Sequence, residues 1–352
     1  MEGYFAVEAK PRSWKKGLAI FGALAIIGTI AALAAFSAQK QVPLALAQIE
    51  LEEGEFKSFM AFYNKQYSTE EEYQRRFRIF RDNAAYARVF NTLGETYLLG
   101  INEFSDLTAK EFSDRVSRPF DHSKVTKNVK WIESLSIPSS IDWTQQGAVT
   151  PVLNQGQCGS CWSFSAAGAI EGIWKISRGI LIAVSEQQLI DCSTLYGNKG
   201  CEGGTVNYAF EYVIKNGGIT SSSNYPYIGK QGTCKNYLAS QKFVAISSYA
   251  NVPANNVDQL YKAVAQQPVS VAVDAGQAFW QSYKSGIVSS GCGTQLDHSV
   301  LIVGYNQTNW QPYWKVKNSW GAFWGEAGYI RIAVVNGKGA CGIQMMPSYP
   351  IF

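Results

Sequence analysis

The chain has 352 residues, enough for two ordinary domains or for one domain preceded by a segment that is later removed. Hydrophobic residues make up 46% and charged residues 16%, a composition that supports a buried core and excludes a disordered chain. The formal net charge of +4 comes without a dense basic block, so the sequence gives little support for nucleic-acid binding.

The N-terminal part contains an uncharged run over residues 17–38, between basic residues and Lys40. This run is long enough to cross a bilayer as a helix. Positive charge ahead of it predicts residues 1–16 as a cytosolic tail, with the rest of the chain across the membrane. We favour an uncleaved signal anchor in the precursor. A cleaved signal peptide, ending near Ala45-Leu46-Ala47, is the alternative. In both cases the rest of the chain is delivered across the membrane into a lumenal space.

Residues 50–112 are charged and their pattern predicts helix. Five side chains follow one another at intervals of 4, 4, 3 and 8, which keeps them on one helical stripe: Glu72, Arg76, Phe80, Asn83 and Asn91. On its own, such a stripe is more often a solvated amphipathic helix. Alternation over residues 100–106 predicts a short strand, with Asn102, Phe104 and Asp106 on one side. Residues 113–136 are polar and lack clear periodicity, which indicates a linker that is cut.

The remaining chain changes from helical to β-rich patterns. A helix is expected over residues 162–176, and a second helix start near Ser185. Short β-rich runs predict strands at 268–273, 298–303, 314–317 and 329–333. We therefore expect an α+β domain over residues 137–352, with a helical lobe at about 146–245, a β-rich lobe at about 246–343 and a cleft between them.

All seven cysteines lie between residues 158 and 341. An odd count suggests three disulfides and one thiol kept free for chemistry. Disulfides persist in secretory and lumenal compartments, in agreement with the N-terminal segment. Seven reduced, buried cysteines in a cytosolic protein are the alternative that the N-terminus disfavours.

One short motif concentrates the chemistry. Residues 154–164 read Asn-Gln-Gly-Gln-Cys-Gly-Ser-Cys-Trp-Ser-Phe, and they contain Gln155 and Cys161. His298 is the one histidine within residues 137–352, and Asn318 follows it in Lys-Asn-Ser-Trp-Gly. At these spacings, residues 50–352 resemble a papain-like, cathepsin L-type proenzyme. The helical stripe resembles the ERFNIN propeptide pattern, with Ala87 where isoleucine is usual, and Gly100, Asn102, Phe104 and Asp106 resemble the second propeptide motif.

The resemblance implies a role for each catalytic candidate. Cys161 would be the nucleophile, His298 the base and acid, and Asn318 the residue that orients the imidazole ring. Gln155 and the backbone N–H of Cys161 would stabilise the oxyanion. Trp320 would shield the pair formed by His298 and Asn318. The implied disulfides are Cys158–Cys201, Cys192–Cys234 and Cys292–Cys341.

The same resemblance implies the residues that contact substrate: Gly203, Gly204, Val206, Ala272, Leu296, Asp297, Ser299, Trp320 and Met346. The side chains implied around the second residue before the cut are all uncharged, so we expect a preference for apolar or aromatic residues there: Val206, Ala272, Leu296, Ser299 and Met346. Met346 and Thr205 both depart from the cathepsin L pattern. Exopeptidase activity is disfavoured, because the region has neither extra histidines nor an extra propeptide cysteine.

Several expectations concern the whole protein. It should be a zymogen that uses protein and peptide substrates, with its own propeptide as inhibitor and with a monomeric mature form. We expect the lumen of a lysosome or vacuole, or secretion. Carboxylates such as Glu72 and Asp106 suggest an acid trigger that breaks charged contacts between the propeptide and the mature domain. Asn306-Gln307-Thr308 is a glycosylation sequon, and no cofactor, metal or nucleotide motif appears.

Three other functions are compatible with parts of the sequence. An acyl transferase could use the same Cys–His chemistry, but the paired propeptide motifs argue against it. A non-catalytic protein on a protease scaffold would be expected to lack Cys161, His298 or Gln155, and all three are intact. An isolated inhibitor module is excluded by the complete catalytic half.

Overall fold

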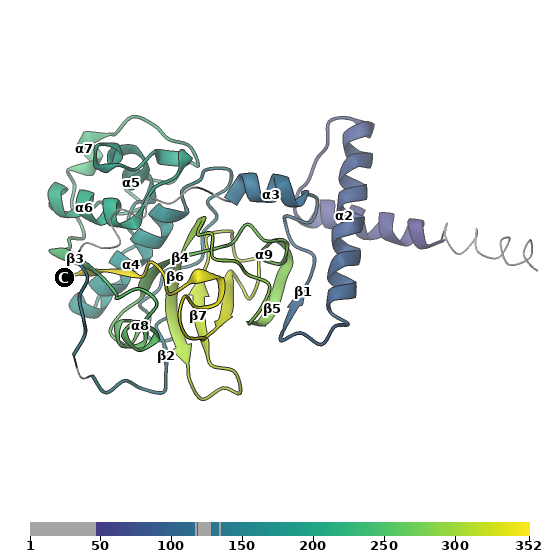
Figure 1. Cartoon of the computed structure of the whole chain (residues 1–352). Helices are drawn as coiled ribbons and strands as arrows, with labels where there is room; N and C mark the ends of the chain where they lie inside the picture. The colour runs from purple at the N-terminus through teal and green to yellow at the C-terminus, as the bar shows by residue number, and fades with distance from the viewer. Residues whose placement is uncertain (1–46, 117, 119–127, 134) are drawn as a thin grey trace, which may run out of the picture. The chain divides into compact units, whose positions relative to one another are not determined.

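The structure is a computed structural model that describes residues 47–116, 118, 128–133 and 135–352 (Figure 1). Within these ranges, no helix is both long enough and apolar enough to span a membrane. The expected cytosolic tail and the signal anchor at 17–38 lie outside the described residues. The chain divides into two units, Met1–Tyr67 and Ser68–Phe352. In the first, a helix covers residues 47–62, and the ring of Phe56 stacks on those of Phe59 and Tyr67.

The second unit begins with helix α2 (Glu70–Phe90). The side chain of Thr69 caps it by accepting the N–H of Glu72, and three glutamates in the first turn favour the positive end of the helix dipole. The buried residues of α2 recur every three or four positions: Phe77, Phe80, Ala84 and Ala87. Strand β1 (Tyr97–Leu99) and helix α3 (Ala109–Val116) follow.

The predicted strand over residues 100–106 is wrong. The side-chain oxygen of Asn102 accepts the backbone N–H of Phe104 at 2.9 Å, and the backbone N–H of Ser105 bonds to the carbonyl of Asn102. These local bonds fold the segment into turns, because an asparagine side chain competes with the ladder bonds of a strand. The strand lies just ahead, in β1. Helix α3 also runs to Val116, four residues into the segment expected to be linker.

The helical lobe is built around α4 (Cys161–Arg178), which confirms the helix predicted over 162–176. Helix α5 (Glu186–Cys192) starts directly after its N-cap residue Ser185, as expected. The lobe also contains helices α6 (Val206–Asn216) and α7 (Asn236–Ala239) and the short 3-10 helices η2 (Thr194–Tyr196) and η3 (Gly200–Glu202). Figure 1 shows α5, α6 and α7 gathered near α4. Helix α4 lies close against the sheet, since a Cβ at Gly168 would come within 2.7 Å of the Leu301 side chain.

The described residues form one nine-stranded sheet, in the order β1-β5-β8-β7-β6-β4-β9-β3, with β2 beside β6. Besides β1, its strands are β2 (Ser140–Asp142), β3 (Ser248–Asn251), β4 (Val269–Val273), β5 (Tyr283–Val288), β6 (His298–Asn306), β7 (Tyr313–Lys317), β8 (Tyr329–Ala333) and β9 (Ser348–Ile351). The helices α8 (Val257–Val264) and α9 (Ala278–Ser282) and the turn η4 (Ala340–Gly342) connect them. The four predicted strands correspond to β4, β6, β7 and β8, which confirms the α+β class with a helical and a β-rich lobe. The propeptide contributes β1, which pairs with β5 in antiparallel register.

Candidate active site

Cys161 is the first residue of helix α4 and is almost fully buried. The first backbone N–H groups of a helix have no partner within it, so they favour negative charge at this position. The backbone N–H of Ser299 points at the sulfur, with a nitrogen–sulfur distance of 3.4 Å. Burial nevertheless raises the pKa of the Cys161 thiol to about 11, and the N–H groups of Ser299 and Trp162 oppose this shift. Burial at this position therefore disfavours the thiolate form of Cys161.

His298 opens strand β6, directly before the residue whose N–H reaches the sulfur. Its Nε2 lies 2.8 Å from the side-chain oxygen of Asn318, and its Nδ1 is buried without a hydrogen-bond partner among the described residues. Trp320 stacks on the imidazole, with ring centroids 4.7 Å apart. Burial lowers the pKa of His298 to about 4, and the bond with Asn318 counteracts part of this shift. The ring is therefore held by Nε2, and Nδ1 is the nitrogen left for chemistry.

Gln155 is fixed by contacts at both ends of its amide. Its Nε2 donates to the carbonyl of Cys158 at 3.0 Å, and its Oε1 accepts the hydroxyl of Ser319 at 2.6 Å. The backbone N–H of Gln155 also bonds to the Ser319 carbonyl. An amide nitrogen carries two protons, so one N–H of Gln155 remains for a further acceptor. Ser319 was not singled out in the sequence, although it stands directly between Asn318 and Trp320.

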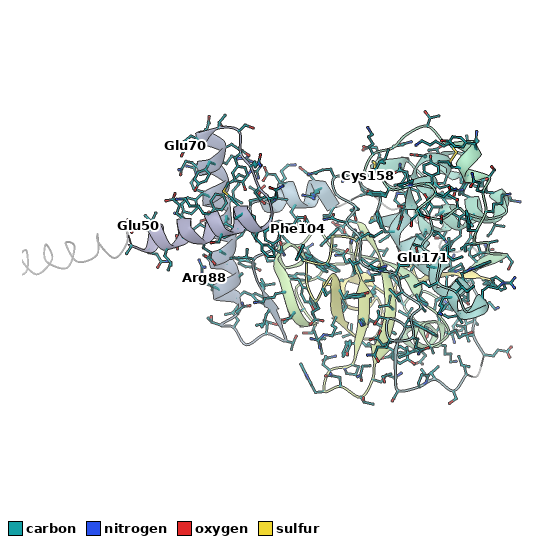
Figure 2. All side chains as sticks on the ribbon, turned by 180° about the vertical axis from the view of Figure 1, so that it is seen from behind. Glu50, Glu70, Arg88, Phe104, Cys158 and Glu171 are labelled. Atoms are coloured by element: carbon teal, nitrogen blue, oxygen red, sulfur yellow. A yellow bond between two sulfur atoms is a disulfide. The ribbon has the colours of Figure 1, made fainter. Side chains whose placement is uncertain are left out.

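The disulfides join Cys158 to Cys201, Cys192 to Cys234 and Cys292 to Cys341, the three pairs that the resemblance implies, and leave Cys161 as the free cysteine. Figure 2 labels Cys158 among the side chains of the helical lobe. The bridge to Cys201 brings the following residues, Gly203 and Gly204, toward the site. A Cβ at Gly204 would lie 2.7 Å from the Trp162 ring, so this close approach requires glycine.

Three of the expected substrate-binding residues form a small apolar cluster: Ala272, Leu296 and Met346. Ser299 pairs with Ala272 across strands β6 and β4. Val206 starts helix α6 and belongs to the core of the helical lobe. The carboxylate of Asp297 accepts the backbone N–H groups of Ala275 and Gly276, so this side chain secures a loop.

The propeptide covers this region with aromatic and basic side chains. Phe104 and Phe112 both pack edge-on against Trp320, with centroid distances of 5.7 and 5.4 Å. Arg115 donates to the carbonyl of Gly156, and the backbone N–H of Arg118 donates to the carbonyl of Asp297. The residues around the buried thiol are therefore in direct contact with the propeptide. Figure 2 labels Phe104 at the boundary between α3 and the β-rich lobe.

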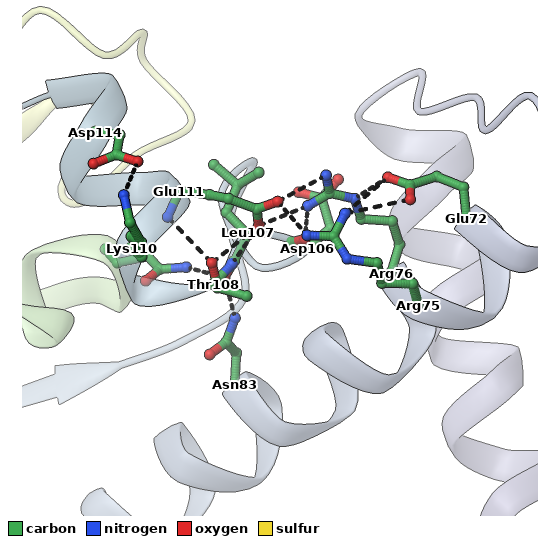
Figure 3. Close-up of polar contacts among 11 residues, drawn as sticks. Glu72, Arg75, Arg76, Asn83, Asp106, Leu107, Thr108, Lys110, Glu111 and Asp114 are labelled. Atoms are coloured by element: carbon green, nitrogen blue, oxygen red, sulfur yellow. Dashed lines mark hydrogen bonds and ion pairs between the residues drawn. The ribbon is translucent and has the colours of Figure 1, made fainter.

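The helical stripe of α2 binds other parts of the propeptide (Figure 3). Arg76 pairs with Glu72 at 2.7 Å and with Glu111 at 2.9 Å, and Arg75 pairs with Glu111 at 2.6 Å. Asn83 donates to the carbonyls of Ser105 and Leu107. Further along, Asn91 makes two bonds with the backbone of Leu99 in β1. The stripe thus holds the turn at 105–107, β1 and α3 in place.

This network corrects the expected acid trigger for Glu72. Its ion-pair partners, Arg75 and Arg76, lie in the propeptide itself rather than in the mature domain. Glu111, which lies outside both propeptide motifs, is the more strongly affected carboxylate. Burial raises its pKa, but the N–H of Thr108 and both arginines outweigh burial and lower the pKa to about 2. A sequence signal was present, because Thr108-Ala-Lys-Glu111 has the spacing of a capping box.

The sequon residue Asn306 ends strand β6, and its side-chain oxygen accepts the backbone N–H groups of Thr308 and Asn309. The sequon therefore lies in a turn that leads into the β6–β7 loop, where Trp310 is largely exposed.

Comparison with known proteins agrees with this geometry. The family model "Papain family cysteine protease" matches residues 137–351, and "Cathepsin propeptide inhibitor domain (I29)" matches residues 56–112. The cysteine proteinase RD21A of Arabidopsis thaliana is 47% identical over 80% of this chain, which spans 62% of that relative's length. The senescence-specific cysteine protease SAG39 of Oryza sativa subsp. indica is 43% identical over 83% of this chain and 88% of its own.

Solved structures of precursors are also similar. A recombinant stem bromelain precursor superposes with a TM-score of 0.80 at 42% identity, covering 86% of this chain and 99% of the other. Digestive procathepsin L 3 of Tenebrio molitor larval midgut gives a TM-score of 0.78 at 39% identity, covering 86% and 99%. Both are proforms, as this chain is. The chain belongs to the papain family of cysteine proteases and is the zymogen form, in which a cathepsin-type propeptide inhibitor domain precedes the protease domain.

Proposed function

We propose that this zymogen yields an endopeptidase that cleaves peptide bonds through a thioester on Cys161. The observation that carries the proposal is the arrangement around the buried thiol. Cys161 begins α4, the N–H of Ser299 points at its sulfur, and the adjacent His298 is held by Asn318 through Nε2. A nucleophile, a base and a residue that orients the base are the parts that covalent catalysis needs.

In the acylation step, His298 Nδ1 takes the proton from the Cys161 thiol, and the sulfur attacks the peptide carbonyl carbon. The new C–S bond places negative charge on the carbonyl oxygen. The free N–H of Gln155 and the backbone N–H of Cys161 stabilise that charge, because donors fixed in advance need not reorganise. The imidazolium then gives its proton to the amide nitrogen as the C–N bond breaks and the amine leaves.

In the deacylation step, His298 takes a proton from water, and the resulting hydroxide attacks the thioester. The C–S bond breaks, the carboxylic acid product leaves, and the sulfur regains its proton from the imidazolium. Trp320 covers the imidazole ring and limits the access of water to its bond with Asn318, which keeps the ring in a productive orientation.

Latency follows from burial beneath the propeptide. Burial favours the protonated thiol and the neutral imidazole, which are the less reactive forms of these two groups. Removal of the propeptide would rehydrate both groups and favour the thiolate–imidazolium pair, which the N-terminus of α4 also stabilises.

The test is hydrolysis of fluorogenic peptides before and after acid treatment of the full chain, beside a Cys161→Ala variant. We expect cleavage that depends on acid treatment and is absent in the variant. Absence of cleavage under every condition, with Cys161 still labelled by a thiol reagent, would overturn the proposal. Product analysis with an amine acceptor separates hydrolysis from acyl transfer.

For specificity, we propose that the second residue before the cut is apolar or aromatic. The apolar cluster of Ala272, Leu296 and Met346 supports this, because an uncharged pocket makes burial of a charged side chain costly. Peptides that differ only at this position test it, with arginine against leucine or phenylalanine. Faster cleavage of the arginine peptide would contradict it.

We further propose that the enzyme acts in a lumen, either in a lysosome-like or vacuolar compartment or after secretion. Three disulfides and an N-terminal apolar run support an oxidising, secretory route. On this proposal, residues 17–38 anchor the precursor in the membrane. A cut at the end of the linker, residues 113–136, releases a monomeric enzyme that starts near Ile137. Asn306 is glycosylated. N-terminal sequencing and glycosidase treatment of the protein from its native source check these points.

A further inference from the structure

The β-rich lobe uses the propeptide as a sheet neighbour, and this shows what its β5 edge accepts. Strand β1 is the last strand of the sheet, and β5 is its one neighbour there. The backbone N–H of Ile287 donates to the carbonyl of Thr96 at 2.9 Å, and the N–H of Gly100 donates to the carbonyl of Ser282 at 2.7 Å. When β1 leaves, these two backbone groups of the protease lose their partners.

Side chains beside the edge complete the site. The ring of Tyr97 is buried and packs edge-on against Phe279, with centroids 5.6 Å apart. Asn102 donates to the carbonyl of Gln281 at 2.6 Å, and the amide of Gln281 donates in return to the carbonyl of Phe104. The extended chain of β1 is thus held by backbone hydrogen bonds, and its Tyr97 side chain packs against Phe279.

The site is separate from the catalytic residues. Strands β8 and β7 lie between β5 and β6, the strand that begins with His298. Along the sheet, β5 and β6 are therefore three strands apart. A peptide paired with the β5 edge does not occupy the strand that carries His298.

We propose that, once the propeptide has left, the β5 edge and Phe279 bind an extended, aromatic-bearing segment of a protein substrate. This inference rests on the proposed function, since it concerns how the same enzyme captures long substrates. An exposed strand edge is a template for adding another strand, where backbone bonds give affinity and a side-chain pocket gives selectivity. A protein substrate that engages the edge and the cleft together gains effective concentration at the cleft, whereas a short peptide does not.

The first arm of the test uses the enzyme obtained by processing the full chain. A synthetic peptide of residues 93–101 is the probe, because it carries β1 and lacks the segment that crosses the site. The substrates are a short fluorogenic peptide and an unfolded protein. At about twice its own dissociation constant, the probe should raise the KM for the protein about threefold and leave the short peptide unaffected. A probe with Tyr97→Ser should act far more weakly.

The second arm changes the edge. A Cβ at Gly286 would come within 2.5 Å of the carbonyl of Thr96, so Gly286→Val should block any added strand. Because Gly286 also has a φ of +101°, Gly337→Val is the matched control: it has a φ of +74° and open space around it. Gly286→Val should lose probe binding and raise the KM for the protein substrate, whereas Gly337→Val should do neither.

Each outcome is decisive even if Gly286→Val fails to fold, because the first arm needs no variant. The proposal is overturned if the probe leaves protein cleavage unchanged or slows both substrates equally. It is also overturned if the mature enzyme forms a dimer that the probe dissociates, since a second copy would then occupy the edge. Failure of the wild-type enzyme to cleave the short peptide would instead contradict the proposed function.

Discussion

The hydroxyl of Ser319 donates to Oε1 of Gln155 at 2.6 Å, and this contact fixes which end of the Gln155 amide faces the reaction. With Oε1 engaged, Nε2 points toward the carbonyl of Cys158, and its second N–H is the donor that we propose for the oxyanion. Ser319 acts through Gln155, so it is a positioning residue.

Replacement of Ser319 by alanine should therefore lower kcat about 3- to 10-fold with little change in KM, because the donor remains but is no longer held. Gln155→Ala should lower kcat by roughly 100-fold or more. Steady-state kinetics of both variants on one fluorogenic peptide provide the check. A rise in KM at constant kcat for Ser319→Ala would show that it acts on substrate binding instead.

The ion-pair network of the propeptide predicts the pH of activation. Glu111 has a folded-state pKa of about 2 and an ordinary value of 4.5, so its contribution to stability is present above pH 4.5 and is lost as the pH falls toward 2. Glu111→Gln should lower the free energy of unfolding of the propeptide by about 1–3 kcal/mol. Autoprocessing should then begin at a higher pH. Asp82→Asn, at an exposed residue of α2, is the control and should process as the wild type does. Processing of Glu111→Gln with an unchanged pH profile would contradict a role for this network.

The reactivity of Cys161 should differ sharply between the precursor and the mature enzyme. Burial raises the pKa of its thiol to about 11 in the precursor, where it is overwhelmingly protonated at pH 7. We expect alkylation to be on the order of 100-fold slower in the precursor, and to accelerate with rising pH. Mass spectrometry can follow it cleanly, because the other six cysteines are in disulfides. Equal rates in the two forms would contradict latency by burial.

Asn198 should position the segment proposed to pair with substrate. It is buried, its Oδ1 accepts the backbone N–H of Thr205 at 2.8 Å, and its Nδ2 donates to Ser193 at 2.9 Å. Asn198→Ala should raise KM about 5- to 10-fold for peptides that extend several residues before the cut. A minimal ester substrate that does not reach this segment should be unaffected. Equal losses on both substrates would point to a general loss of fold.

The buried carboxyl group of Glu186 should make the protease more stable in acid than at neutral pH. Burial, and next the nearby carboxylate of Glu171, raise the pKa of Glu186 to about 8. Because this value exceeds the ordinary 4.5, the folded protein keeps a proton that the unfolded chain releases, and stability falls as the pH rises from 4.5 to 8.

Glu186→Gln should remove this loss. We expect the Tm of the variant to exceed that of the wild type by roughly 3–8 °C at pH 7.5 and to match it at pH 4.5. Glu202→Gln, at an exposed glutamate, is the control. A variant that is destabilised equally at both pH values would show that Glu186 contributes through packing alone.

Local patterns in the sequence predicted the elements that local physics determines. Helix α4 and strands β4, β6, β7 and β8 were predicted from propensity and periodicity, and the N-cap Ser185 from its side chain. The turn at Asn102 was missed because its alternating pattern fits a strand equally well, and only the side-chain bond to Phe104 decides between them.

Contacts between distant segments were harder to predict. Phe112 packs on Trp320, and Arg118 reaches Asp297, from parts of the chain that no short pattern relates. The error on the acid trigger has a different, local cause: Glu72 and Arg76 were placed on one helical stripe, but the ion pair that this i,i+4 spacing allows was not predicted. A short motif identifies a functional residue by its type and position, whereas the partner of that residue is known only once the chain is folded.

The shared sheet has a consequence for how the precursor becomes active. Because β1 is hydrogen-bonded to β5, release of the inhibitor requires that the backbone bonds at one end of the sheet break. As the terminal strand, β1 has a neighbour on one side alone, so its loss disrupts a single pairing. Activation should therefore resemble the fraying of an edge strand, beginning wherever its flanking turns melt first, and the remaining eight strands keep their pairing throughout.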